Sequence, residues 1–336
     1  MNIKYRTYQL ELANPFGLSR SVRTEVPSFV IIMEHEGFVG LGECTVNPFY
    51  QNSLKSFQQT LDKYLQALTI EHWLTPEEYW LHIYGILKGH EFLLCAIDQA
   101  YWDLYSQFKK STTRNLLGLG AHTELLSNYT IGLDEIPVML RKMKDQPWPL
   151  YKIKLGSSQD LEILRALRSE TNAVFRVDAN CGWTVNQVLD WQDELIELGV
   201  EFIEQPLKVE DVQGAKVLFE NSKIPIIADE SCLTIDDVAI CHDQFHGINI
   251  KLMKCGGMTP ALQMIHKARA LGMKVMMGCM TESSVGIAAI AQFASALDYI
   301  DLDGAMLIKN DPADGVKLEQ GHILYPNRLG NGARLF

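Results

Sequence analysis

Three carboxylates in the middle of the chain stand where they could share one site. Asp178 in FRVDAN, Glu204 in FIEQP and Asp229 in IIADES each close a run of apolar residues just before a turn. Such runs are typical of buried parallel strands, whose carboxyl ends meet at one rim of a sheet. We therefore expect the three side chains to converge, although each acid taken alone is equally well explained as the cap of a following helix.

Converging carboxylates require a cation to offset their charge. The three positions offer oxygen ligands only, with no His or Cys beside them, which suits a hard ion such as Mg²⁺ better than Zn²⁺ or Cu²⁺. The sequence therefore predicts one Mg²⁺ per subunit, with coordination positions left for water and an anionic substrate.

Lysines bracket the three acids along the chain. Lys152 and Lys154 in YKIKLG are two residues apart on a predicted strand, so both side chains point to the same face of the sheet. In a barrel, that face is the interior. Buried ammonium groups need anionic partners, which Asp178 on the next strand, the metal and the substrate would supply. Lys251 in INIKLM lies on the sixth predicted strand, across from Lys154 on the second. One lysine could thus face each side of the flat intermediate formed when a proton α to a carboxylate is removed.

The elements that position these residues recur as strand-then-helix units spaced by roughly two dozen residues. Amphipathic stretches such as LEILRALRSE and ALQMIHKARALG, with apolar residues three and four apart, separate the strands. The pattern predicts an α/β protein in which residues 121–308 form a (β/α)7β TIM-like barrel. Its strands are NYTIGL, LYKIKL, VFRVDAN, EFIEQP, IPIIADE, GINIKLM, KVMMGC and YIDLDG.

The first 120 residues do not show the repeated strand–helix pattern. Alternating runs in NIKYRTYQLEL and SFVIIMEHEGFVGLGE predict an antiparallel meander, and SLKSFQQTLDKYLQAL and EFLLCAIDQAYWDLYSQFKK predict helices. We expect residues 1–120 to form a separate α+β capping domain. The tail, residues 309–336, is punctuated by Pro and Gly, and we expect it to return to that domain.

Bulk properties exclude several kinds of partner. The chain has 336 residues, is 47% hydrophobic and carries a formal charge of −11, which argues against binding nucleic acid or an anionic membrane. The amino terminus lacks the apolar run of a signal peptide, and no stretch is apolar enough to span a membrane. The seven cysteines are scattered, with no CxxC pair, as is typical of reduced cytoplasmic thiols. We expect a cytoplasmic homo-oligomer.

These motifs together resemble the enolase superfamily, specifically its muconate-lactonizing branch. The resemblance rests on KIK at 152–154, on DAN, EQP and ADES at the strand ends, on NIKLMKCGG at 249–257, and on AIDQAYWDL in the amino-terminal region. It implies that Asp178, Glu204 and Asp229 bind Mg²⁺. It also implies that Lys154 and Lys251 are the two acid/base residues.

The eighth predicted strand narrows the reaction. Asp301 and Asp303 in DLDG resemble the pair with which dipeptide epimerases receive the substrate's α-ammonium group. The resemblance thus implies epimerisation at the second residue of an L-Ala-type dipeptide by a two-base proton transfer. An N-acylamino-acid racemase or an o-succinylbenzoate synthase on the same scaffold is the nearest alternative. A metal-binding barrel without catalysis, serving in assembly or regulation, is an alternative from another class.

Two loops of the capping region, ANPFGLSRSVRT and TVNPFYQNS, are expected to select the second residue. In epimerases of acidic dipeptides an arginine on the first loop meets the side-chain carboxylate, and here that position falls on Ser21. Phe16, Phe49 and Tyr50 offer aromatic surface, so we expect apolar or small second residues to be preferred over Glu. Five further substrate contacts are expected, at Lys152, Thr130, Arg20, Met280 and Glu282.

Overall fold

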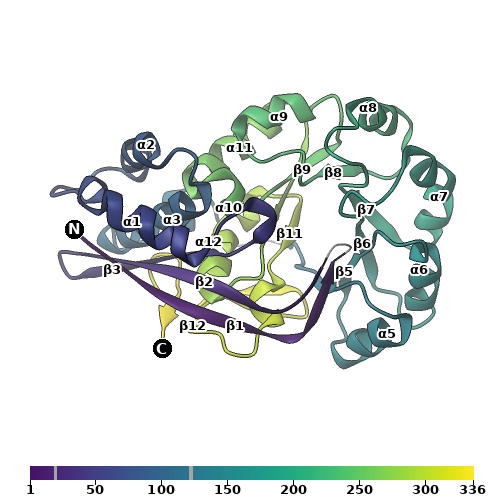
Figure 1. The fold of residues 1–336 in the computed structure, drawn as a ribbon, viewed down its shortest axis with the longest axis horizontal. Coiled ribbons are helices and arrows are strands. Elements are labelled where there is room, and N and C mark those ends of the chain that lie inside the picture. The colour runs from purple at the N-terminus through teal and green to yellow at the C-terminus, as the bar shows by residue number, and fades with distance from the viewer. Residues whose placement is uncertain (19–20, 121–123) are drawn as a thin grey trace.

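A closed barrel of eight parallel strands dominates the structure (Figure 1). The computed structural model describes residues 1–18, 21–120 and 124–336, and the side chains of residues 16–22 lie outside that description. Each strand pairs with its neighbours in sequence, and Ser127 bridges in parallel to Ile300, which closes the sheet. The predicted barrel is confirmed. Its strands are β4 (Tyr129–Ile131), β5 (Leu150–Lys154), β6 (Val174–Asp178), β7 (Val200–Glu204), β8 (Ile226–Ala228), β9 (Gly247–Ile250), β10 (Lys274–Gly278) and β11 (Tyr299–Asp301).

Helices fill all seven connections between the barrel strands and lie outside the sheet. Local signals start several of them: Thr184 and Gln187 form a reciprocal capping box at one, and Asp211 caps another through Gly214 N–H. The helices are α5 (Ile136–Asp145), α6 (Asp160–Arg168), α7 (Val185–Glu197), α8 (Val212–Asn221), α9 (Ile235–Cys241), α10 (Leu252–Cys255), α11 (Met258–Ala270) and α12 (Ser284–Ala291).

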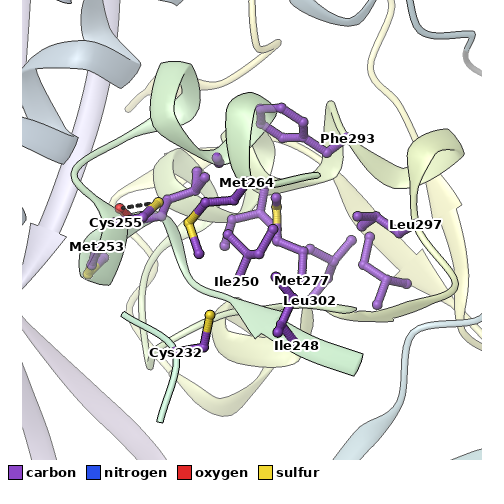
Figure 2. Packing of buried hydrophobic residues seen from close by; sticks show 14 of the residues in the cluster. Cys232, Ile248, Ile250, Met253, Cys255, Met264, Met277, Phe293, Leu297 and Leu302 are labelled. Atoms are coloured by element: carbon purple, nitrogen blue, oxygen red, sulfur yellow. Dashed lines mark hydrogen bonds between the residues drawn. The ribbon is translucent and has the colours of Figure 1, made fainter. Parts of the chain in front are cut away.

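Side chains along each barrel strand point alternately outward to the helices and inward to the barrel. On β9, Ile248 and Ile250 are fully buried among apolar side chains, which in Figure 2 include Met264 of α11. The intervening Asn249 points into the barrel, where its amide donates to Glu204 Oε1 at 2.8 Å, and Lys251 follows on the same side. The outward face therefore anchors each strand to the helices and leaves the inward face free to carry polar groups.

The capping domain is the predicted antiparallel meander with helices packed on it, at the left of Figure 1. Gly40 and Gly42 of β3 lie so close to α3 that an added Cβ would stand 2.1 Å from Ala100 O and 2.0 Å from Ala96 O, so a side chain at either position would push the helix away. The elements are β1 (Asn2–Leu18), β2 (Ser21–His35), β3 (Phe38–Thr45), the 3-10 turn η1 (Pro48–Tyr50), α1 (Leu54–Leu68), α2 (Pro76–Leu87), α3 (Glu91–Phe108) and α4 (Thr113–Leu116).

Two features of this domain differ from the expectation. Helix α2 was not expected, although Thr75 and Glu78 form a capping box at its start. The segment ANPFGLSRSVRT, predicted as a loop, is largely the distal end of the β1–β2 hairpin, in which Phe16 pairs with Arg23 along the backbone. None of the helices in the described ranges has the length and apolarity needed to cross a lipid bilayer.

The carboxyl-terminal tail contacts both parts of the molecule. Asn331 N–H donates to Asp103 of α3 at 2.6 Å, and Asn310 exchanges hydrogen bonds with Gln9 and Glu11 of β1. The backbone carbonyl of Gly321 accepts a hydrogen bond from the N–H of Ser127, just before β4, at 2.9 Å. The division into residues 1–120, 121–308 and 309–336 stays a prediction. The turn η3 (Asp303–Leu307) precedes the tail, whose elements are β12 (Ala313–Asp314), β13 (Lys317–Glu319), β14 (His322–Leu324) and β15 (Arg334–Leu335).

Candidate active site

The structure brings the three predicted metal ligands together at one rim of the barrel. Asp178 and Glu204 are register partners at the ends of β6 and β7, and Asp229 directly follows β8. Each offers a carboxylate oxygen, these atoms all lie within 4.8 Å of one another, and the three side chains are buried. Three buried carboxylates at this spacing, with oxygen donors only, suit a hard divalent cation.

Lys154 and Lys251 face this cluster from opposite sides. Lys154 Nζ lies 2.6 Å from Asp178 Oδ2, and Lys251 Nζ lies 2.7 Å from Asp229 Oδ2. Lys154 ends β5 and Lys251 follows β9, two strands that are four positions apart in the closed eight-stranded sheet. The two ammonium groups therefore approach the rim from diametrically opposed strands, and both side chains line the same cavity.

Two further lysines support the cluster from within the protein. Lys152 Nζ lies 2.7 Å from Glu204 Oε2 and 3.2 Å from Asp301 Oδ2. Lys254 Nζ donates to Asp229 Oδ1 at 2.6 Å and also to three backbone carbonyls. Lys254 was not predicted, although its place in NIKLMK, three residues after Lys251, was visible. Its contacts depend on the single turn of α10, which the sequence pattern did not reveal.

The electrostatics of the rim follow from these pairings. Burial disfavours the charged form of Lys251, but the Asp229 carboxylate outweighs burial and holds the pKa of Lys251 above its ordinary value. Burial would likewise raise the pKa of Asp229, but Lys251 and Lys254 hold it well below the usual range. Burial and the neighbouring Asp178 raise the pKa of Glu204. Glu204 is thus the member of the cluster that is least well compensated by protein cations.

Asp301 and Asp303 line the same cavity from the end of β11. Both are almost fully buried, which excludes a solvated acidic turn. Asp301 Oδ1 accepts from Asn128 at 2.9 Å, and Asp303, which begins η3 beyond the strand end, accepts from Thr130 N–H. Burial and the adjacent Asp301 hold the pKa of Asp303 well above its usual range. A cationic group entering from the cavity would favour the ionised form of Asp303, and the two side chains could then share it.

A cavity of about 420 Å³ connects these two ends beneath the capping domain. Among the residues predicted to contact substrate, its walls include Thr130, Lys152, Phe49, Tyr50 and Met280. Glu282 is not among the described residues that line the cavity, because its carboxylate turns back to accept from Met280 N–H.

Other parts of the wall were not anticipated. The side chains of Phe16 and Arg20 lie outside the described residues. Arg23 was not predicted to reach the cavity, yet it lines it and donates to Asn47 Oδ1 at 3.1 Å. Arg23 therefore places a guanidinium group in the cavity wall, although the acid-binding position itself falls on Ser21.

The charges of the described rim leave room for a cation. Burial and neighbouring carboxylates raise the pKa values of Glu204, Glu230 and Asp303, and an added divalent ion would relieve this repulsion between the acids. The carboxylates are Asp178, Glu204, Asp229, Glu230, Asp301 and Asp303, and the ammonium groups are Lys152, Lys154, Lys251 and Lys254.

Comparison with known families agrees with the fold and the rim. Residues 2–118 match the model of the mandelate racemase / muconate lactonizing enzyme amino-terminal domain, and residues 138–335 match the enolase carboxyl-terminal domain-like model. The chain belongs to this family of the enolase superfamily, which confirms the membership that the motifs predicted.

Individual relatives cover the whole chain. The L-Ala-D/L-amino acid epimerase of Flavobacterium johnsoniae is 45% identical over 100% of both chains. Among solved structures, the dipeptide epimerase of Methylococcus capsulatus, in complex with Mg and L-Arg-D-Lys, has a TM-score of 0.93 and 29% identity over 100% of this chain and 99% of that one. The dipeptide epimerase of Cytophaga hutchinsonii, with Mg and D-Ala-L-Val, has a TM-score of 0.92 and 25% identity over 99% and 95%.

Proposed function

We propose that the protein is a Mg²⁺-dependent dipeptide epimerase that inverts the α-carbon of the second residue. The observation that carries this proposal is the placement of Lys154 and Lys251 on opposed barrel strands around one cavity. One lysine removes the α-proton from its face of the carbon, and the other returns a proton to the opposite face. The roles exchange with the configuration of the substrate, so both stereoisomers are processed.

Asp178, Glu204 and Asp229 are the residues that would hold the metal. When bound, a divalent ion would supply electrostatic stabilisation of the negative charge that develops on the substrate, on the order of 8 kcal/mol for charges ~4 Å apart at an effective dielectric near 20. The chain's own contribution is to fix the three carboxylates at successive strand ends and to tie each one to a lysine. Such ties restrict the carboxylates before substrate arrives.

Asp301 and Asp303 select a substrate with a free amino terminus. They line the cavity at the end of β11, four strands from β7 in the closed sheet, and an α-ammonium group would reach them if the dipeptide carboxylate is at the metal. N-acylamino-acid racemases and o-succinylbenzoate synthases act on substrates without this cation. With such substrates the two buried carboxylates would have no cationic partner, which would destabilise the complex. This pair, together with the relatives that are named epimerases, favours a dipeptide over the alternatives.

The second residue meets a wall that is both aromatic and cationic. Tyr50 supplies apolar surface, as predicted, but Arg23 adds a guanidinium group whose described hydrogen bond is to the neutral Asn47. A Glu side chain would therefore not meet a purely apolar surface, which was the reason for expecting it to be disfavoured. We propose that the pocket accepts apolar side chains against Tyr50 and carboxylate side chains at Arg23.

Proton exchange in D₂O tests the proposed function. With Mg²⁺ present, the α-proton signal of the second residue of an L-Ala dipeptide should disappear from the NMR spectrum as the epimer appears. Lack of exchange with every dipeptide would favour a metal-binding barrel without catalysis. Equal turnover of free and N-acetylated dipeptides would favour a racemase.

The proposal also includes the cellular location and the oligomeric state of the enzyme. The described residues form no disulfide, which is typical of proteins kept in a reducing compartment and supports the proposal of a cytoplasmic location. The homo-oligomeric state stays a prediction, and light scattering of the purified chain measures it.

A further inference from the structure

Two side-chain oxygens at the rim face the cavity without a hydrogen-bond donor among the described residues. They are Glu230 Oε2 and Asn180 Oδ1, both shielded from bulk solvent. Asn180 Nδ2 lies 3.4 Å from Glu230 Oε1, so the two side chains stand together. Buried acceptors in folded proteins are nearly always paired, which indicates that the donor for these two comes from a bound species.

Both residues adjoin the metal ligands. Glu230 directly follows Asp229, and Asn180 N–H donates to Asp178 Oδ1 at 3.1 Å. Asn180 has a φ of 44°, in the left-handed region, where a non-glycine residue is strained and where such strain recurs at functional sites. The backbone thus holds the Asn180 side chain beside Glu230 at a conformational cost.

Glu230 differs from its neighbours in lacking a cation. Asp178, Glu204 and Asp229 each have a lysine nitrogen within ion-pair distance, at 2.6 to 2.7 Å. Within the described part of the chain, no lysine or arginine nitrogen comes within 4.0 Å of Glu230. A side chain without an ion-pair partner keeps its Oε2 available to a hydrogen-bond donor from the cavity.

We propose that Glu230 and Asn180 are positioning residues of the metal site, which accept hydrogen bonds from water in the coordination shell of the ion. The inference rests on the proposed function, since it presumes a bound Mg²⁺. Magnesium usually keeps several waters, and each such water has protons that need acceptors. Outer partners of this kind orient the inner ligands, and their loss typically weakens metal binding about 10–100-fold.

Calorimetric titration of the purified chain with MgCl₂, without substrate, tests this role. Glu230→Met removes charge and acceptor, and its Kd for Mg²⁺ should rise about 10–100-fold. Glu230→Gln keeps an acceptor oxygen, and its Kd should rise by a smaller factor. Glu210→Gln, which changes an exposed glutamate on the neighbouring β7–α8 loop, is the matched control and should bind Mg²⁺ like the wild type.

The outcomes separate this inference from the proposed function. Wild-type affinity in both Glu230 variants would overturn the inference while leaving the epimerase proposal intact. A wild-type chain that binds no Mg²⁺ would overturn both. Circular dichroism identifies misfolded protein, and if Glu230→Met fails to fold, the nearly isosteric Glu230→Gln decides, with an unchanged Kd as the contradicting result.

Discussion

The barrel rim and the capping wall enclose the same cavity but are built in different ways. At the rim, charged groups stand at the ends of paired strands, and each proposed metal ligand is paired with a lysine at 2.6 to 2.7 Å. In the wall, Tyr50 belongs to a short 3-10 turn, and the cation, Arg23, has one described hydrogen bond, to Asn47. The rim is fixed by strand register, whereas the wall depends on a hairpin end and a loop.

This difference suggests that the rim carries out the proton transfer and that the wall selects the second residue of the dipeptide. Groups fixed by strand register suit proton transfer, which tolerates little displacement of the reacting atoms. Loop-borne groups can change without disturbing the barrel, and specificity commonly resides on them. Changes at the rim should therefore lower turnover of every dipeptide, and changes in the wall should alter the ratio between dipeptides.

Removal of either catalytic lysine should have the largest effect. Lys154→Ala and Lys251→Ala should each lower kcat for epimerisation by at least about 10³-fold with every dipeptide, because one face of the α-carbon loses its proton donor and acceptor. Chiral chromatography of the products measures this. Lys216→Ala, at an exposed position on α8, is the control. Near wild-type epimerisation by either site variant would remove that lysine from the mechanism.

Loss of a metal ligand should come next. EDTA should abolish activity and added Mg²⁺ restore it, and Glu204→Gln should raise the Kd for Mg²⁺ at least about 100-fold, because an anionic ligand becomes a neutral one. Calorimetry and activity assays measure the two effects. Unchanged Mg²⁺ affinity in Glu204→Gln would exclude Glu204 from the ligand set.

Asp303→Asn should have an intermediate effect that depends on the substrate. A hydrogen bond to a charged group contributes about 1.5–3 kcal/mol, so kcat/KM for free dipeptides should fall roughly 10- to 100-fold. Mg²⁺ affinity should stay near the wild-type value, since Asp303 lies beyond the end of β11, four strands from β7 in the closed sheet. The same fall with an N-acetylated dipeptide would show that the residue does not bind the ammonium group.

A change in the wall should have the smallest effect, visible as a ratio. Arg23→Leu should lower kcat/KM for Ala-Glu relative to Ala-Leu about tenfold, because a partly exposed ion pair is lost while apolar contact with Tyr50 remains. Steady-state kinetics with both dipeptides measure the ratio. Equal losses for the two substrates would contradict the division between rim and wall.

The barrel and the rim followed from the sequence because each depends on local pattern. Apolar runs ending in Asp178, Glu204 and Asp229 indicate parallel strands, and strand register brings their ends together. The two-residue spacing of Lys152 and Lys154 likewise fixed the side on which both point, which the structure places toward the cavity.

Other features depend on contacts that no local pattern encodes. Lys254 was missed because its partners are backbone carbonyls gathered by a one-turn helix. Arg23 was misjudged because the hairpin extends further than its loop-like sequence indicates. The α2 helix was missed because apolar residues also lie off its buried face, at the exposed Leu81 and the half-buried Tyr84 and Ile86, so its amphipathic period is weak.

Stereospecific exchange in D₂O tests the two-base claim most directly. Lys154→Ala and Lys251→Ala are each incubated with Mg²⁺ and either L-Ala-L-Leu or L-Ala-D-Leu, and NMR follows the α-proton of the second residue. Each variant should exchange that proton in one stereoisomer and not in the other, and the two variants should show opposite preferences, because each retains the lysine on a different face. If both variants exchange the same stereoisomer, the two lysines do not act on opposite faces and the account is wrong.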